Sequence, residues 1–145
     1  MKPAPISLLE YFATDMALSA NPLYDSSKGL ELKDAEYNVD VRVDAAPSES
    51  GPARWQVTLE IGQQTAPETN FPYSFRLVLV GFFEVARPSS PEQDERFVKI
   101  QGASVLYGMA REIVRAITGR GPHSPVMLPT VSFYEPAVAS SPVEN

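Results

Sequence analysis

The sequence predicts an α+β fold in which a four-stranded antiparallel sheet is followed by one long helix. Two observations carry this prediction. Apolar and polar residues alternate in three segments between residues 37 and 85, as in strands that bury one face and expose the other. Beyond residue 100 the apolar residues recur at helical spacing instead. Sheet first and helix second is therefore the expected order.

The first two alternating segments form a predicted hairpin-like pair. Apolar residues occupy every second position in both: Tyr37, Val39, Val41 and Val43, then Trp55, Val57, Leu59 and Ile61. The connection, APSESGP, consists largely of turn-forming residues. We therefore expect these two segments to pair antiparallel.

The third alternating segment, residues 71–85, is apolar on both of its faces. One face carries Tyr73, Phe75, Leu77 and Leu79. The other includes Val78 and Val80, so this strand is expected to be central or covered on both sides. Gly81 before two phenylalanines predicts a bulge or bend.

Residues 6–19 fit two structures. Ile6, Leu8, Phe12, Met16 and Leu18 share even positions, which indicates a strand, whereas Ser7 to Glu10 fits the capping box of a helix. We favour the strand because the three later strands need partners. Asn21-Pro22 would end either element.

The helix is predicted to follow a loop at residues 86–96. Its apolar stripe consists of Leu106, Met109, Ala110, Ile113 and Ile117. Gly119 or Gly121 could supply a left-handed C-terminal cap, and Pro122 prevents continuation. Residues 1–134 are expected to form one domain, followed by a disordered tail at 135–145.

Composition excludes several classes of protein. At 145 residues the chain has room for one modest core, and its apolar runs are too short to cross a bilayer. It shows no secretory signal and no cysteine, so we expect a cytoplasmic protein without membrane insertion. The net charge of −6 argues against a nucleic-acid partner.

Candidate catalytic or metal-binding groups are sparse. The single histidine, His123, is expected to be a solvated loop side chain, and Ser124 beside it lies in no GxSxG elbow. Neither GxxxxGK[ST] nor GxGxxG occurs. Two acidic groups, interpreted as a solvated face and a solvated loop, lack nearby histidine or cysteine: Asp40 with Asp44, and Glu92 with Asp94 and Glu95. We therefore expect no enzyme, no metal site and no cofactor.

The aromatic and aliphatic residues of 71–83 exceed what one helix can cover. A single helix covers one face of a sheet, so the other face must meet a partner or a ligand, or remain an exposed patch. Three classes of function follow: a binder of unfolded polypeptide, an oligomeric interaction protein without chaperone activity, and a binder of small apolar ligands.

The helix and its exit resemble the C-terminal signature of the SecB family of export chaperones. The matching residues are Tyr107, Ala110-Arg111-Glu112, Thr118-x-Arg120-Gly121 and the Leu128–Phe133 segment LPTVSF. The resemblance covers roughly residues 5–134, with four strands before the helix and Gly81 at the end of the fourth.

The resemblance implies an ATP-independent holdase that assembles as a dimer of dimers, a homotetramer. Its clients would be unfolded preproteins, or one dedicated client such as an antitoxin, held in apolar aromatic grooves. Carried over by position, the client-binding residues are Tyr73, Phe75, Leu77, Leu79 and Phe133.

Two departures from the family pattern concern the translocase ATPase SecA. Asp15 matches one of the acidic residues that contact SecA, but Ser19 and Arg76 stand where acids are expected. Glu135-Pro136 interrupts the region where family members continue into a second helix. The sequence therefore predicts a divergent, short SecB-like protein with weakened SecA binding.

Overall fold

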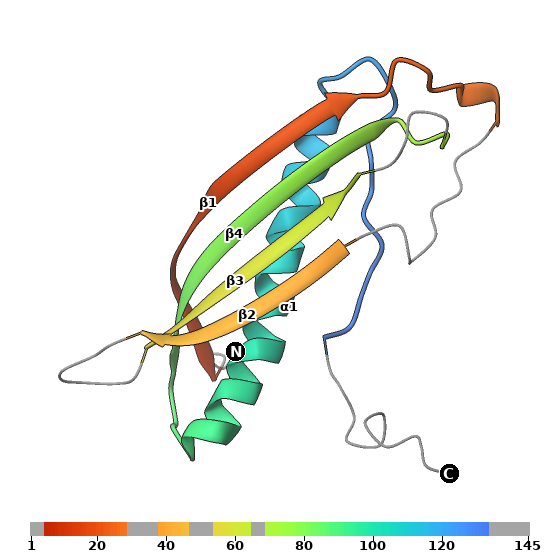
Figure 1. Ribbon diagram of the computed structural model, residues 1–145. Coiled ribbons are helices and arrows are strands. Elements are labelled where there is room, and N and C mark those ends of the chain that lie inside the picture. The colour runs from red at the N-terminus through yellow and green to blue at the C-terminus, as the bar shows by residue number, and fades with distance from the viewer. Residues whose placement is uncertain (1–4, 29–37, 47–53, 65–68, 134–145) are drawn as a thin grey trace, which may run out of the picture.

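The computed structural model describes residues 5–28, 38–46, 54–64 and 69–133. Its elements are β1 (Ile6–Ala20), the short 3-10 helix η1 (Ser26–Lys28), β2 (Asn38–Ala46), β3 (Arg54–Gln63), β4 (Tyr73–Val85) and α1 (Pro91–Thr118). The strands form one antiparallel sheet in the order β1-β4-β3-β2 (Figure 1). The predicted α+β fold and the strand character of residues 6–19 are confirmed.

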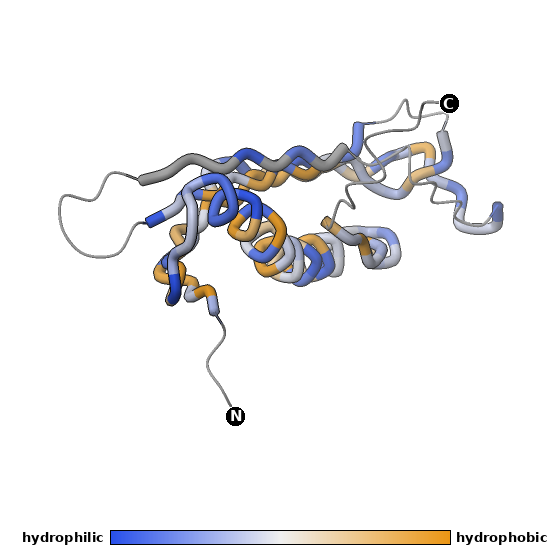
Figure 2. Tube along the Cα trace, turned by 90° about the horizontal axis from the view of Figure 1, so that it is seen from below, coloured by the Kyte–Doolittle hydropathy of each residue, from blue (hydrophilic) through white to orange (hydrophobic). Residues whose placement is uncertain are grey.

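The molecule has two layers, the sheet and α1, which packs across one face of it (Figure 2). The core lies between these layers. Its fully buried members from the strands include Val57, Leu59, Phe75, Leu79 and Phe83, and α1 contributes Val98, Leu106, Ala110 and Val114. Close packing between the layers depends on Gly102, since a Cβ there would lie 3.0 Å from Val57 Cγ2.

Strands β2 and β3 pair antiparallel in continuous register, as predicted, with Val41 opposite Leu59. Tyr37 lies outside the described residues. The register between β3 and β4 is also continuous, so the predicted bulge at Gly81 is wrong. Gly81 instead permits a close approach: a Cβ there would lie 2.9 Å from Phe83 Cε1 and 3.0 Å from Leu106 Cδ2.

The register shifts occur in β1 instead. One lies between Leu8 and Glu10, the other between Ala13 and Asp15. Each leaves one extra residue on β1 and therefore exchanges the face on which the following side chains lie.

Helix α1 begins earlier than predicted, at Pro91. Ser90 is its N-cap, with Ser90 Oγ accepting a hydrogen bond from Gln93 N at 3.2 Å, and Pro91 fits the first turn because its missing N–H has no partner to lose. The interpretation of residues 86–96 as a loop was thus wrong beyond Ser90. Asp94 is buried rather than solvated, and its carboxylate accepts hydrogen bonds from Ser89 N and Ser89 Oγ, both at 3.0 Å.

The end of α1 also differs from the prediction. Gly119 is the C-cap with φ −67°, a right-handed conformation, and Gly121 is not left-handed either. Gly121 is required for another reason, because a Cβ there would lie 2.2 Å from the hydroxyl of Tyr73. The exit from α1 therefore packs directly on β4.

Candidate functional site

The edge strand β1 carries a concentration of exposed apolar side chains. Their exposed fractions are 44% for Leu9, 43% for Tyr11, 41% for Phe12, 49% for Met16 and 36% for Leu18. These five side chains define the β1 surface, whereas Leu8 is partly buried and packs against the core. Isolated exposed apolar residues are common in folded proteins, but five on one strand indicate a binding surface.

The position of α1 and the two bulges explain why these side chains are uncovered. Helix α1 runs across one face of the sheet and has its most extensive contacts with β3 and β4, whereas β1 stands at the edge next to β4 (Figure 1). By register, Tyr11, Met16 and Leu18 lie on the α1 side of the sheet, opposite Gly81, Leu77 and Phe75. Phe12 lies opposite Val80 on the other side, where its ring centroid is 6.1 Å from that of Phe82. The β1 surface therefore presents apolar groups on both faces.

The residues predicted to bind client from β4 lie elsewhere. Tyr73, Phe75 and Leu77 are each 1% exposed and Leu79 is 0% exposed, all on the α1-covered face. In the single chain a client could touch them only if α1 or a neighbouring segment moved. Client contact by these four side chains therefore remains a prediction, and their observed role is to form the core.

Phe133, the fifth predicted client residue, is half-buried at the end of the segment that follows α1. We call residues 124–133 the C-terminal arm. Phe133 packs edge-on against Tyr107 of α1, with the ring centroids 5.7 Å apart. Burial raises the pKa of Tyr107, while the charge of Arg111 opposes the shift. The structure thus places Phe133 on α1, where it packs against the same core that the four β4 residues help to form.

His123 makes more contacts within the fold than the sequence suggested. Its Nε2 lies 2.9 Å from the carbonyl oxygen of Asn21, and its ring packs 4.9 Å from Tyr24 and 5.5 Å from Tyr73. His123 N also donates to the Tyr73 hydroxyl at 2.9 Å. The prediction of a solvated loop histidine is wrong, and the residue joins the end of β1 to the exit of α1.

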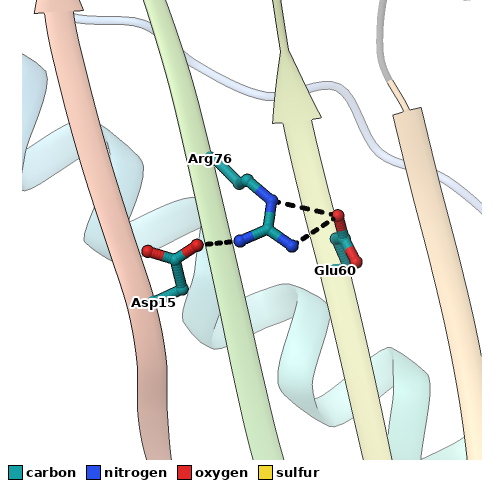
Figure 3. A network of polar contacts seen from close by, with 3 residues as sticks. All are labelled: Asp15, Glu60 and Arg76. Atoms are coloured by element: carbon teal, nitrogen blue, oxygen red, sulfur yellow. Dashed lines mark hydrogen bonds and ion pairs between the residues drawn. The ribbon is translucent and has the colours of Figure 1, made fainter.

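Asp15, the predicted translocase contact, belongs to an ion-pair network on the face away from α1. The guanidinium of Arg76 pairs with Asp15 and also with Glu60, through Nε at 3.1 Å and a second nitrogen at 3.0 Å (Figure 3). All three side chains are partly exposed. The single positive charge of Arg76 is therefore shared between two carboxylates, and the network joins β1, β4 and β3.

The described residues contain no group of three or more histidine, cysteine, aspartate or glutamate side chains that could hold a metal ion. Asp40 is exposed as predicted, whereas the side chain of Asp44 lies outside the described set. Within the described ranges, no helix is long and apolar enough to cross a membrane.

Comparison with protein families identifies the chain. Residues 3–136 match the family described as preprotein translocase subunit SecB. The chain belongs to the SecB family. The SecB family is a family of chaperones in protein export, and membership supports a role of that kind for this protein.

One curated SecB relative and two solved structures are similar to this chain. The protein-export protein SecB of Rhodopseudomonas palustris (strain TIE-1) is 25% identical over 132 residues, covering 90% of this chain and 81% of that protein. The Mycobacterium tuberculosis Rv1957 SecB-like chaperone, solved with a ChAD peptide from the Rv1956 HigA1 antitoxin, superposes with a TM-score of 0.55. It is 14% identical, with 90% of this chain and 94% of that chain covered. A protein of unknown function from Streptococcus agalactiae gives a TM-score of 0.59 at 14% identity, covering 86% and 97%. These likenesses show that the fold is that of SecB-like proteins.

Sequence reasoning placed the functional emphasis on β4 and missed the β1 surface. Its apolar residues were visible in the sequence, but an apolar alternation does not reveal whether a helix covers it. The edge position of β1 was the missing information. The predicted tail, residues 135–145, lies outside the described residues.

Proposed function

We propose that this protein is an ATP-independent chaperone that holds unfolded polypeptides, with the β1 surface as a primary contact for client. The observation that supports this proposal is the exposure of Leu9, Tyr11, Phe12, Met16 and Leu18 on an edge strand. Such side chains bind through burial of apolar area, which makes little demand on the sequence of the partner. A cytoplasmic setting belongs to the same proposal.

The edge position adds a second means of binding. Among the described elements, β1 pairs with β4 along one edge, and its other edge faces no strand. An extended polypeptide could pair with main-chain groups at that edge while its apolar side chains pack on either face. Main-chain pairing is also independent of client sequence.

Self-association uses the same surface chemistry and completes the proposal. The family resemblance implies a dimer of dimers, in which parts of the apolar surface would be buried between copies. Both uses can coexist, because β1 is apolar on two faces and spans fifteen residues. The assembly expected in solution is therefore a homotetramer that retains apolar grooves.

A triple variant, Tyr11→Ser with Met16→Ser and Leu18→Ser, tests the proposal. These residues lie on one face of β1, so the change removes one apolar stripe. Losing three apolar contacts should weaken client binding by about tenfold or more. The measurement is the scattering of a thermally aggregating client as a function of chaperone concentration, with molar mass determined in parallel.

Leu23→Ser is the matched control, because Leu23 is exposed but lies in the loop after β1. It should suppress client aggregation as the unmodified protein does. Equal suppression by the triple variant would contradict the role of β1. The non-chaperone interaction protein would instead be supported by two results together. The unmodified protein would fail to suppress aggregation, and the triple variant would lose the assembly. Saturable binding of an apolar dye that unfolded client cannot displace would support the small-ligand binder.

Delivery to SecA is expected to be weak. Asp15 is the acidic residue matched to the translocase contact, and its charge is offset by Arg76. Arg76→Glu should therefore strengthen binding to SecA, measured by a pull-down with purified SecA and an unfolded preprotein. Preproteins or a dedicated client such as an antitoxin remain the proposed partners.

A further inference from the structure

The C-terminal arm is held on α1 through its main chain. Thr118 Oγ1 accepts from Val126 N at 2.9 Å, Arg111 Nε donates to the Leu128 carbonyl at 3.1 Å, and the Tyr107 hydroxyl donates to the Pro129 carbonyl at 2.6 Å. The order along the arm is opposite to the order along α1. The arm therefore runs antiparallel beside the helix, without regular secondary structure of its own (Figure 1).

These three α1 residues lie on one side of the helix. Tyr107, Arg111 and Thr118 are separated by four and seven residues, which is one and two helical turns. Thr118 Oγ1 also donates to Val114 O at 2.6 Å, so its hydroxyl is oriented to accept from the arm. We call this row of side chains the arm groove.

Side-chain selection in the arm groove is limited. Val126 and Leu128 are buried at 5% and 1% exposure, whereas Met127 between them is 56% exposed. The three hydrogen bonds involve only main-chain groups of the arm. The groove thus holds a segment with two apolar side chains two residues apart, and it contacts the main-chain N–H of the first, the carbonyl of the second and the next carbonyl along the chain. Many unfolded polypeptides contain such a segment.

We propose that the arm groove is itself a polypeptide-binding site, occupied by the arm in the resting chain and taken by an apolar client segment that displaces the arm. This inference rests on the proposed chaperone function and adds a second site to the β1 surface. The arm follows the end of α1 after residues 119–123, so it competes at the high effective concentration of a short tether. A client that also binds the β1 surface through other apolar segments can displace the arm, whereas a short isolated segment cannot. The arm thereby sets a threshold for client binding.

The test weakens the arm and leaves the groove intact. Leu128→Ala and, as a milder second variant, Val126→Ala remove buried arm side chains in the full chain. Met127→Ala is the matched control, since it alters the same arm at an exposed position. The probe is a fluorescently labelled peptide with the sequence of residues 123–133, HSPVMLPTVSF. Its anisotropy reports binding, and circular dichroism at 222 nm confirms that α1 persists.

The labelled peptide should bind the Leu128→Ala and Val126→Ala proteins saturably, and at least about tenfold more tightly than the unmodified and Met127→Ala proteins. A reduced, alkylated protein that cannot refold should displace the peptide. It should itself bind the weakened-arm variants more tightly than it binds the unmodified chain.

Two results would overturn the inference while leaving the chaperone proposal standing. In one, the unfolded protein binds the variants without displacing the peptide, which would mean that the groove binds the arm sequence and not clients. In the other, the variants keep their helix and bind unfolded protein, but neither binds the peptide. Failure of every form of the protein to bind unfolded protein would overturn the chaperone proposal and this inference with it.

Discussion

Strands β4 and β1 are neighbours with similar apolar patterns and opposite environments. The register of the two strands places Leu18 opposite Phe75 and Met16 opposite Leu77, on the same face of the sheet. The β4 residues are 1% exposed, but their β1 partners are 36% and 49% exposed. The difference arises because α1 covers β4 and leaves β1 at the edge. Position under the helix, and not composition, separates the buried core from the exposed apolar surface.

This contrast divides stability from function. Burial of the β4 side chains under α1 stabilises the folded chain. The β1 side chains keep exposed apolar area that a partner can bury. A substitution under α1 should therefore act mainly on the free energy of unfolding. A substitution on β1 should act mainly on client binding and assembly.

The largest expected effect comes from the opposed pair Phe75 and Leu18. Phe75→Ala should lower the free energy of unfolding by about 3–5 kcal/mol, because it leaves a cavity under α1. Leu18→Ala should lower it by about 1 kcal/mol or less, since that side chain is partly in solvent already. Urea unfolding followed by circular dichroism at 222 nm measures both, over a range of protein concentrations. A Phe75→Ala protein that is fully stable but fails to bind client would instead favour the original placement of the client site on β4.

A second pair of substitutions examines how the exit of α1 covers β4. Gly121→Ala should cost about 1–3 kcal/mol, because the new methyl group overlaps the buried ring of Tyr73. Gly108→Ala, with nothing within 4 Å of its Cβ, should raise the free energy of unfolding by about 0.5–1 kcal/mol. Thermal and urea unfolding of the two variants provide the comparison. Equal effects of the same sign would show that the exit does not pack on β4 as described.

A smaller effect is expected from the ion-pair network that joins β1 to β4 and β3. In a double-mutant cycle of Arg76→Ala and Asp15→Ala, the coupling free energy should be about 0.2–1 kcal/mol, because both side chains are partly exposed. It should decrease as sodium chloride is raised from low to high concentration. Unfolding free energies of the four proteins at each salt concentration give the coupling. A coupling that is insensitive to salt would contradict an exposed pair.

The smallest expected effect is the pH dependence contributed by Tyr107. Its pKa is raised in the folded chain, so the folded state holds the phenolic proton more tightly than the unfolded state, where the pKa is about 10. The resulting stability is present below about pH 10 and is lost as pH rises through the folded-state pKa. Tyr107→Phe should make the decline above pH 10 shallower, as measured by urea unfolding at several pH values. An unchanged slope would remove Tyr107 as its source.

The sequence alone predicted the fold class well because the alternation in β3 and β4 and the helical spacing of α1 are long and regular. It missed features that depend on single atoms or on register. Ser90 and Pro91 are a helix start that was readable in the sequence but was interpreted as part of a loop. The conformations of Gly119 and Gly121 were not readable, because glycine permits several, and the close approach of Gly121 to Tyr73 depends on the tertiary packing.

The candidate site was less predictable than the fold. The even-numbered apolar residues of β1 look like one stripe, yet the bulges after Leu8 and Ala13 place Phe12 on one face and Met16 and Leu18 on the other. A register shift has no residue signature here. The ion pairs of Arg76 likewise required the lateral order of three strands.

The sequence by itself determined which segments become strands and helix, and that the chain carries more apolar surface than one helix covers. These properties can be read locally, because the backbone repeat of a strand or a helix sets which residues share a face. Only the tertiary structure decided that the uncovered surface is β1 and that β4 is core. That decision depends on where α1 crosses the sheet and on the register of β1, both set by contacts between residues distant in the chain.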